Sequence, residues 1–144
     1  MNKERIIELI NKAGKKSFFA GKLDDDKINN IEKTLNLKLP NSYKWFLKEY
    51  GTGGVDGVDI LGGGIKETPT CIVETLDWRK FGLPESFLVI ENCDEWLYCL
   101  DTSYLKDGEC TVTNWSQVDG FIEDDVYENF YTFIEKRFTL MLGM

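Results

Sequence analysis

The stretch LNLKLPNSYKWFLKEYGTGG, residues 35–54, contains the end of one helix, the whole of a second and a glycine-rich turn. Pro40 suits the opening turn of a helix, where a backbone N–H has no helical partner in any case. Apolar side chains then recur at helical spacing from Tyr43 to Tyr50, and Gly51 suits the C-terminal stop. The stretch therefore predicts a core helix held between two turns.

Two further amphipathic helices are predicted before this stretch. Residues 3–13 carry an apolar stripe at helical spacing, and Gly14 stands where such a helix would stop. Asp24 or Asp25 provides an N-cap for the second helix, whose apolar stripe runs through residues 28–35. The first third of the chain is therefore predicted to be helical.

Strands are predicted after Gly51, where the pattern of apolar residues changes. Residues 58–61 form a short apolar segment between glycine turns. The apolar runs at residues 87–90 and 96–100 predict a hairpin, and residues 111–115 predict a third, antiparallel strand after a turn.

The remaining regular segments are predicted to be helical. Residues 71–80 fit either a short helix or an irregular connection, with the helix favoured. A long amphipathic helix is predicted from about Asp124, because acidic residues favour a first helical turn. This order of elements predicts an α+β fold. We expect one domain over residues 1–144, with N-terminal helices and a long C-terminal helix packed around a central, mostly antiparallel (mixed) sheet.

The composition favours a globular protein of the cytoplasm. With 144 residues, 42% hydrophobic and 13% aromatic, the chain is able to fill a core. We expect no secretory signal and no membrane partner, because no stretch is apolar enough. The four cysteines have no close Cys-x-x-Cys spacing, so we expect reduced core thiols, no metal site and no cofactor.

Histidine is absent from the sequence. A Ser-His-Asp triad, a Cys-His pair and a His-Glu-x-x-His zinc site all need imidazole, so these hydrolase designs are excluded. We therefore expect no enzyme activity. One catalytic alternative remains open, a hydrolase that uses two carboxylates such as Glu91 and Asp101.

Negative charge is concentrated in one segment. The net charge is −8, yet residues 91–128 carry eleven acidic residues against the single base Lys106. Such a segment repels phosphate backbones, which argues against a nucleic-acid partner. A solvated face is the simple explanation, but the cost of clustering one sign of charge favours a protein-binding role. The candidate partner-binding residues are Glu91, Asp94, Glu95, Trp96, Asp101, Trp115, Asp119, Glu123, Asp124 and Asp125.

Residues 35–54 also resemble the signature of the SUKH superfamily, which includes fungal cell-wall-assembly regulators and many bacterial immunity proteins. In that signature a leucine-rich helix end leads into Leu-Pro, a polar pair, an aromatic residue and Phe-Leu before a glycine-rich turn. The strands FLVIEN, residues 87–92, and WLYCLD, residues 96–101, are similar to the family's central hairpin. The matching signature residues are Leu35, Leu37, Leu39, Pro40, Tyr43, Phe46, Leu47, Gly51, Gly53 and Gly54.

The resemblance implies an immunity protein, or antitoxin, that binds a toxin made beside it and prevents self-killing. It implies a cognate protein toxin as partner, often a nuclease (RNase or DNase) delivered with an LXG-type domain, and no catalytic residues. The alternative is a regulatory interaction module without a toxin partner. One departure is that Gly51-Thr52-Gly53-Gly54 stands where the family usually has Asn-Gly-Gly.

Overall fold

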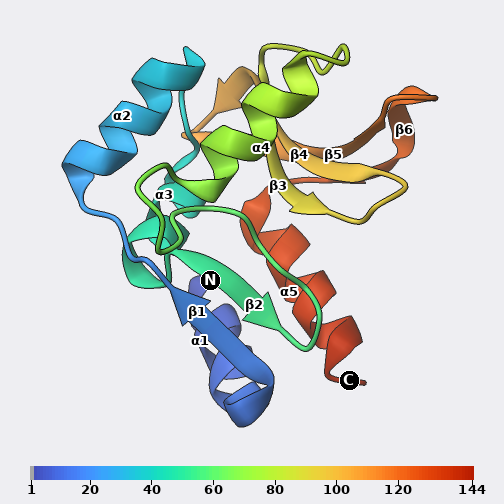
Figure 1. The fold of residues 1–144 in the computed structure, drawn as a ribbon. Helices are drawn as coiled ribbons and strands as arrows, with labels where there is room; N and C mark the ends of the chain where they lie inside the picture. Colours follow the sequence, from blue (N-terminus) through green and yellow to red (C-terminus); the bar gives the residue numbers. More distant parts are fainter. Residues whose placement is uncertain (1) are drawn as a thin grey trace.

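The computed structural model describes the backbone of residues 2–144 and the side chains of residues 3–121 and 126–144; it is an α+β fold (Figure 1). The helices are α1 (Asn2–Ala13), the short 3-10 helix η1 (Gly14–Lys16), α2 (Asp25–Leu35), α3 (Asn41–Glu49), α4 (Thr70–Arg79) and α5 (Phe130–Met141). The strands are β1 (Ser17–Ala20), β2 (Thr52–Val55), β3 (Phe87–Asn92), β4 (Leu97–Lys106), β5 (Glu109–Ser116) and β6 (Gly120–Tyr127).

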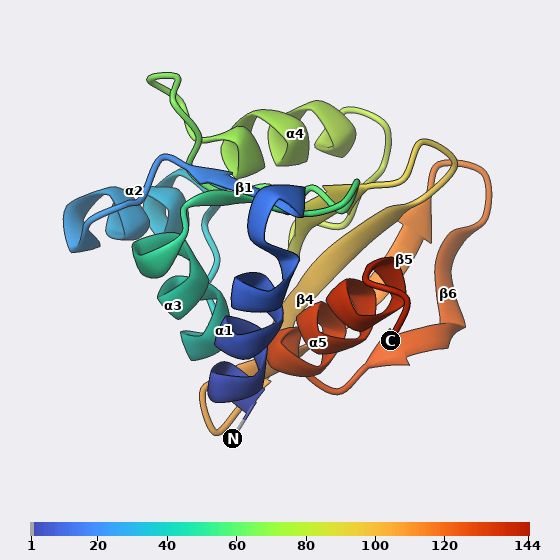
Figure 2. The same ribbon diagram turned by 90° about the horizontal axis from the view of Figure 1, so that it is seen from below.

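Strands β3 to β6 form one antiparallel sheet in the order β3-β4-β5-β6, and β1 and β2 form a separate antiparallel pair. Helix α4 lies over one face of the four-stranded sheet, while α5, with α1 beside it, covers the other (Figures 1 and 2). The larger buried cluster includes Leu100 and Phe133 on the α5 side, and the smaller includes Val89 and Trp115 on the α4 side. The predicted fold class is confirmed.

The outer edge of β3 is covered by the segments that precede it in sequence. The Val89 N–H donates to Oγ1 of Thr75 on α4, at 3.0 Å. One residue further, the Leu61 N–H donates to the Ile90 carbonyl at 2.7 Å. Since an uncovered edge strand tends to pair with other chains, these two bonds protect this side of the sheet.

The signature residues at the start of α3 attach that helix to the β4–β5 turn. Pro40 occupies the N-cap position, and its side chain makes no capping hydrogen bond. Instead, the Glu109 carboxylate accepts hydrogen bonds from the Ser42 N–H, at 3.0 Å, and from the Ser42 hydroxyl. The Asn41 N–H donates to the Gly108 carbonyl at 2.8 Å. A carboxylate is favourable at a helix N-terminus. Helix α3 is thus capped by Glu109, which lies 67 positions from Ser42 in sequence.

The helices predicted at residues 3–13, residues 24–35 and the signature are confirmed as α1, α2 and α3. Asp24 caps α2 by accepting a hydrogen bond from the Lys27 N–H at 3.0 Å. The favoured helix at residues 71–80 is confirmed as α4, and the three predicted apolar runs lie in β3, β4 and β5 or directly beside them.

The strand predicted at residues 58–61 is wrong. Only an isolated bridge joins Ile60 to Gly53, and the regular pairing is made by β2 with β1. The strand that does form, β2, depends on glycine, since a Cβ at Gly53 would collide with the Phe18 carbonyl and one at Gly54 with the Val58 carbonyl. These glycines permit a close approach of backbones that apolar spacing does not reveal.

The predicted start of the last helix near Asp124 is also wrong. Residues 120–127 form β6, which pairs with β5 through contacts such as Trp115 opposite Phe121. Helix α5 begins at Phe130, where the Asn129 side chain accepts a hydrogen bond from the Thr132 N–H at 2.9 Å. The Asn cap therefore marks the helix start, and the acidic run before it belongs to a strand.

Within the described part of the chain, every helix is too short or too polar to cross a lipid bilayer.

Candidate partner-binding surface

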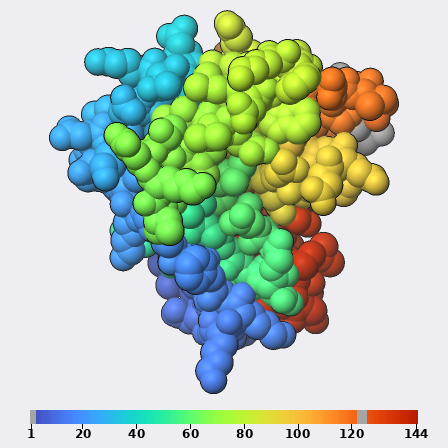
Figure 3. Space-filling model, viewed as in Figure 1, coloured from blue at the N-terminus to red at the C-terminus, as the bar shows by residue number. Residues whose placement is uncertain are grey.

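Three tryptophans meet at one end of the four-stranded sheet. The β3–β4 and β5–β6 turns lie at the same end, because successive hairpins of an antiparallel sheet turn at alternating ends. Helix α4 adds Trp78 to this end. Together these segments line a hollow of about 320 Å³. Figure 3 shows α4 in lime, the β3–β4 turn in yellow and the β5–β6 turn in orange side by side. We call this surface, made of Trp78 and residues 94–97 and 115–119, the tryptophan end.

Trp78 is held in place by contacts on two sides of its ring. Its ring meets Trp115 edge to face, with centroids 6.0 Å apart and planes at 70°. Its indole N–H donates to Oε1 of Glu74 at 3.1 Å, and the Asn92 side-chain amide donates to the same oxygen at 2.6 Å. Helix α4 and strand β3 therefore fix one wall of the hollow.

The two predicted tryptophan anchors have different roles in this hollow. Trp115 is only 5% exposed and belongs to the smaller buried cluster, so it forms part of the floor. Trp96 is 37% exposed, and its ring packs edge-on against Tyr98 with centroids 6.3 Å apart. Trp96 is thus the indole that a partner would reach first.

Three predicted carboxylates lie exposed at the tryptophan end. Asp94 and Glu95 form the β3–β4 turn, in which the Asp94 N–H donates to Oδ1 of Asn92 at 2.8 Å. Asp119 lies in the β5–β6 turn, where its N–H donates to Oγ of Ser116 at 2.9 Å. The bonds in both turns are made by the backbone N–H groups of Asp94 and Asp119. Among the described residues, no lysine or arginine forms a salt bridge with these three carboxylates.

Glu91 does not join this surface, which corrects the expectation for that residue. It is 4% exposed, and its two carboxylate oxygens accept hydrogen bonds from Arg137 of α5 at 3.0 and 2.6 Å. The Arg137 guanidinium also lies 5.5 Å from the centre of the Tyr98 ring. Glu91 is therefore part of the interior on the α5 side of the sheet.

Asp101 lies away from the tryptophan end. It pairs with Phe87, the first residue of β3, whereas the turn follows the last residue of that strand. Its side chain accepts hydrogen bonds from Ser103, from the N–H at 3.1 Å and from the hydroxyl at 2.6 Å. Strand alternation places Asp101 with Cys99 on the α4 face, opposite Glu91, so the two acids of the hydrolase alternative do not face a common site.

The side chains of the last three acidic candidates, Glu123, Asp124 and Asp125, lie outside the described residues. Among the side chains that are described, no group of three or more potential ligands is placed to hold a metal ion.

Trp78 and Val118 are among the residues of the tryptophan end that were not predicted from the sequence. Trp78 lies in the segment whose helix was only slightly favoured, and nothing in its local pattern points toward a distant hairpin. Val118 is 91% exposed at the tip of the β5–β6 turn. The sequence indicates that Val118 is exposed, because it is an apolar residue within the polar turn Gln117 to Gly120.

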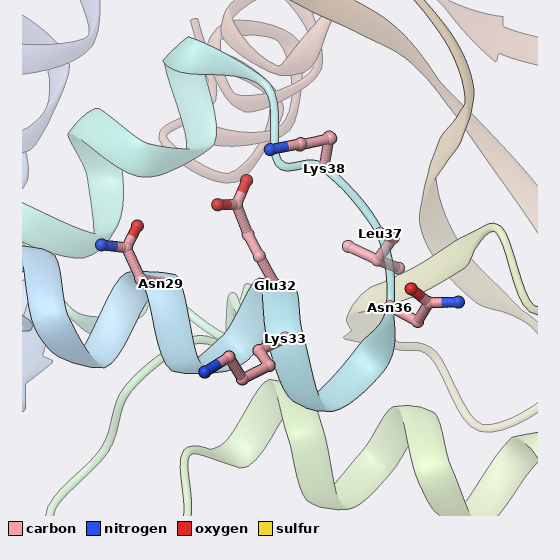
Figure 4. Close-up of a pocket in the computed structure, with 6 residues that line it drawn as sticks. All are labelled: Asn29, Glu32, Lys33, Asn36, Leu37 and Lys38. Atoms are coloured by element: carbon pink, nitrogen blue, oxygen red, sulfur yellow. The ribbon is translucent and has the colours of Figure 1, made fainter.

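A second hollow lies near the C-terminal end of α2, and the carboxylate that lines it is bonded within the fold (Figure 4). Figure 4 shows Glu32 pointing toward the chain that leads from α2 to α3. Its carboxylate accepts a hydrogen bond from the Leu39 N–H at 2.8 Å and lies 3.6 Å from the ammonium group of Lys44. This hollow is polar and of mixed charge, since Lys33 and Lys38 also line it, and it lacks the aromatic walls of the tryptophan end.

All four cysteines are free thiols, as expected. Burial raises the pKa of Cys71 and of Cys110 to about 12, and burial raises the pKa of Cys99 still further. Cys93 is half-buried beside the β3–β4 turn, and burial, followed by the nearby charge of Glu91, raises its pKa to about 12. These groups are therefore protonated at neutral pH and act as small apolar side chains.

A family model matches most of the chain. A model of the SUKH_5 family, described as SMI1-KNR4 cell-wall, matches residues 3–139. The chain belongs to the SUKH family. This membership fits a general role as an immunity or regulatory protein that acts by binding other proteins, and the family is known as a non-catalytic fold.

A solved structure shares the fold of this chain. The crystal structure of a protein from Pseudomonas syringae pv. tomato matches with a TM-score of 0.68 and 18% sequence identity, covering 88% of this chain and 93% of that one. At this identity the likeness supports the fold alone.

Proposed function

We propose that this SUKH protein is an immunity protein that binds a cognate bacterial toxin in the cytoplasm and blocks its active site. The observation that carries the proposal is the tryptophan end, where exposed carboxylates surround an aromatic hollow. Aromatic residues at the centre of a contact and charges at its rim are the usual composition of a protein-binding surface. The unit that acts is taken to be residues 1–144 as one domain.

The toxin is proposed to be a nuclease, an RNase or DNase of an LXG-type system. A nuclease presents a basic groove to phosphates, so an acidic surface of matching shape competes with the substrate for that groove. The net charge of −8 speeds the encounter through long-range attraction. The aromatic side chains of the tryptophan end, once desolvated against the toxin, slow its release.

The proposal is tested by co-expression with the toxin candidate encoded next to this chain. The expected result is that the SUKH protein restores growth and co-purifies with the toxin. A variant with Asp94, Glu95 and Asp119 changed to lysine is expected to lose both effects. Growth arrest by a confirmed toxin that the wild-type chain neither relieves nor binds would refute the proposal.

A second candidate is a regulatory interaction module without a toxin partner, favoured by the cell-wall description of the matching family. The same surface would then bind a protein of the host. The two functions are separated by deleting the gene alone. Loss of an immunity protein kills only cells that carry the toxin gene, whereas loss of a regulator changes cells that lack it.

A further inference from the structure

Among the described residues, a cation lies over three aromatic rings of the molecule but over none of the three tryptophans of the hollow. Lys3 lies 5.6 Å from the ring centre of Trp45, Lys136 lies 5.7 Å from that of Tyr127, and Arg137 covers Tyr98. Among the described residues, no lysine or arginine lines the hollow. An electron-rich site is thus left without a cation from its own chain.

The lining of the hollow has two features that attract a positive charge. The faces of indole rings attract cations through their quadrupole, and tryptophan is the strongest side chain in this respect. Asp94 and Glu95 line the same hollow and provide carboxylate acceptors at its rim. A volume of about 320 Å³ lies at the lower limit of small-molecule pockets, roughly 300–1,000 Å³, and suits one inserted side chain.

We propose that this hollow receives the side chain of an arginine presented by the protein partner, with the guanidinium stacked on Trp96 and bonded to Asp94 or Glu95. Arginine fits better than lysine, because its planar guanidinium stacks on aromatic rings, is weakly hydrated and donates in parallel to a carboxylate. This inference rests on the proposed function and names the chemistry of the partner.

The test is a titration of the full chain, labelled with ¹⁵N, with the peptide Ac-Gly-Arg-Gly-NH₂. The indole N–H signals of Trp78, Trp96 and Trp115 are expected to shift, while that of Trp45 stays in place as an internal control. The peptide Ac-Gly-Cit-Gly-NH₂, in which citrulline replaces arginine, is nearly the same shape without charge. It is expected to bind roughly tenfold more weakly.

A matched variant keeps the shape of the rim and removes its charge. The double variant Asp94→Asn with Glu95→Gln should bind the arginine peptide more weakly than wild type does. Its affinity for the citrulline peptide should be unchanged. Equal shifts with both peptides, equal movement of Trp45, or no shift at the solubility limit of the arginine peptide would each overturn the proposal. If the peptide binds here but no toxin does, the proposed function alone fails. If a toxin binds the double variant and Trp96→Ala as tightly as wild type, the arginine site alone fails.

Discussion

Two groups of carboxylates in this chain have opposite environments. Glu91 and Glu109 are bonded within the fold, the first to Arg137 and the second to Ser42. Asp94 and Glu95 lie only a few residues from Glu91 in sequence, yet their side chains face solvent at the tryptophan end. Charge density along the sequence therefore does not distinguish a carboxylate that stabilises the fold from one that is available to a partner. Burial and the hydrogen bonds made within the fold distinguish the two groups.

The cysteine at the boundary between these environments gives the largest expected effect. Cys93 is half-buried one residue before Asp94, and its pKa of about 12 lowers the thiolate fraction about a thousandfold relative to a free thiol. We expect iodoacetamide at pH 8 to modify the native protein slowly at this site, as measured by mass spectrometry of peptides. Modification as fast as in the urea-unfolded chain would show that the interior does not extend to Cys93.

Loss of the buried ion pair should give the largest change in stability. Arg137→Met leaves the Glu91 carboxylate in the interior without its cation, which costs about 3 kcal/mol or more. The measurement is the free energy of unfolding in urea. Glu95→Gln is the matched control, because it removes an exposed carboxylate and is expected to change stability by less than about 0.5 kcal/mol. Equal losses of stability in Arg137→Met and Glu95→Gln would contradict the distinction between buried and exposed carboxylates.

The carboxylate that caps α3 should have an intermediate effect. Glu109→Ala removes the acceptor of two hydrogen bonds and leaves the buried hydroxyl of Ser42 without this partner, at a cost of about 1–3 kcal/mol. Asp107→Asn, in the adjacent turn, is the control, because it removes a carboxylate and Asn tolerates the positive φ of 54° at this position. A melting temperature for Glu109→Ala as high as that of this control would mean that α3 does not depend on its distant cap.

Charge reversal at the tryptophan end should have the smallest effect on stability. Asp94, Glu95 and Asp119 are exposed, so changing all three to lysine is expected to lower the free energy of unfolding by about 1 kcal/mol at most. Most of this loss is expected at Asp94, whose positive φ of 68° suits Asp better than Lys. Urea unfolding followed by circular dichroism measures this free energy. A large loss of stability would assign these carboxylates to the fold.

Much of the fold was predictable from local patterns, because caps and apolar stripes are local. Asp24, the stripe through α2 and the signature helix illustrate this. The β1–β2 pairing was not predictable, because it depends on how closely the backbones at Gly53 and Phe18 approach. The start of α5 was misplaced because acidic residues favour a helix N-terminus but do not prevent a strand.

The candidate site was only partly predictable for a similar reason. The turn that carries Asp94 and Glu95 was predictable, since a turn between apolar runs faces solvent, whereas Trp96 was predicted as the first residue of a strand. The partner of Glu91, Arg137, lies 46 positions away on another element, and so does the contact that brings Trp78 to Trp115. Such pairings depend on the tertiary structure.

The central claim is that the partner binds at the tryptophan end, and one affinity comparison tests it most directly. The toxin candidate is titrated calorimetrically against two variants of equal net charge. One carries lysine at 94, 95 and 119. The other carries lysine at three exposed acids outside the tryptophan end, Asp26 of α2, Glu49 of α3 and Glu67 of the loop before α4. We predict a loss of affinity on the order of a hundredfold for the first and near wild-type affinity for the second. Equal losses would reduce the effect to net charge, and unchanged affinity for the first variant would contradict the account.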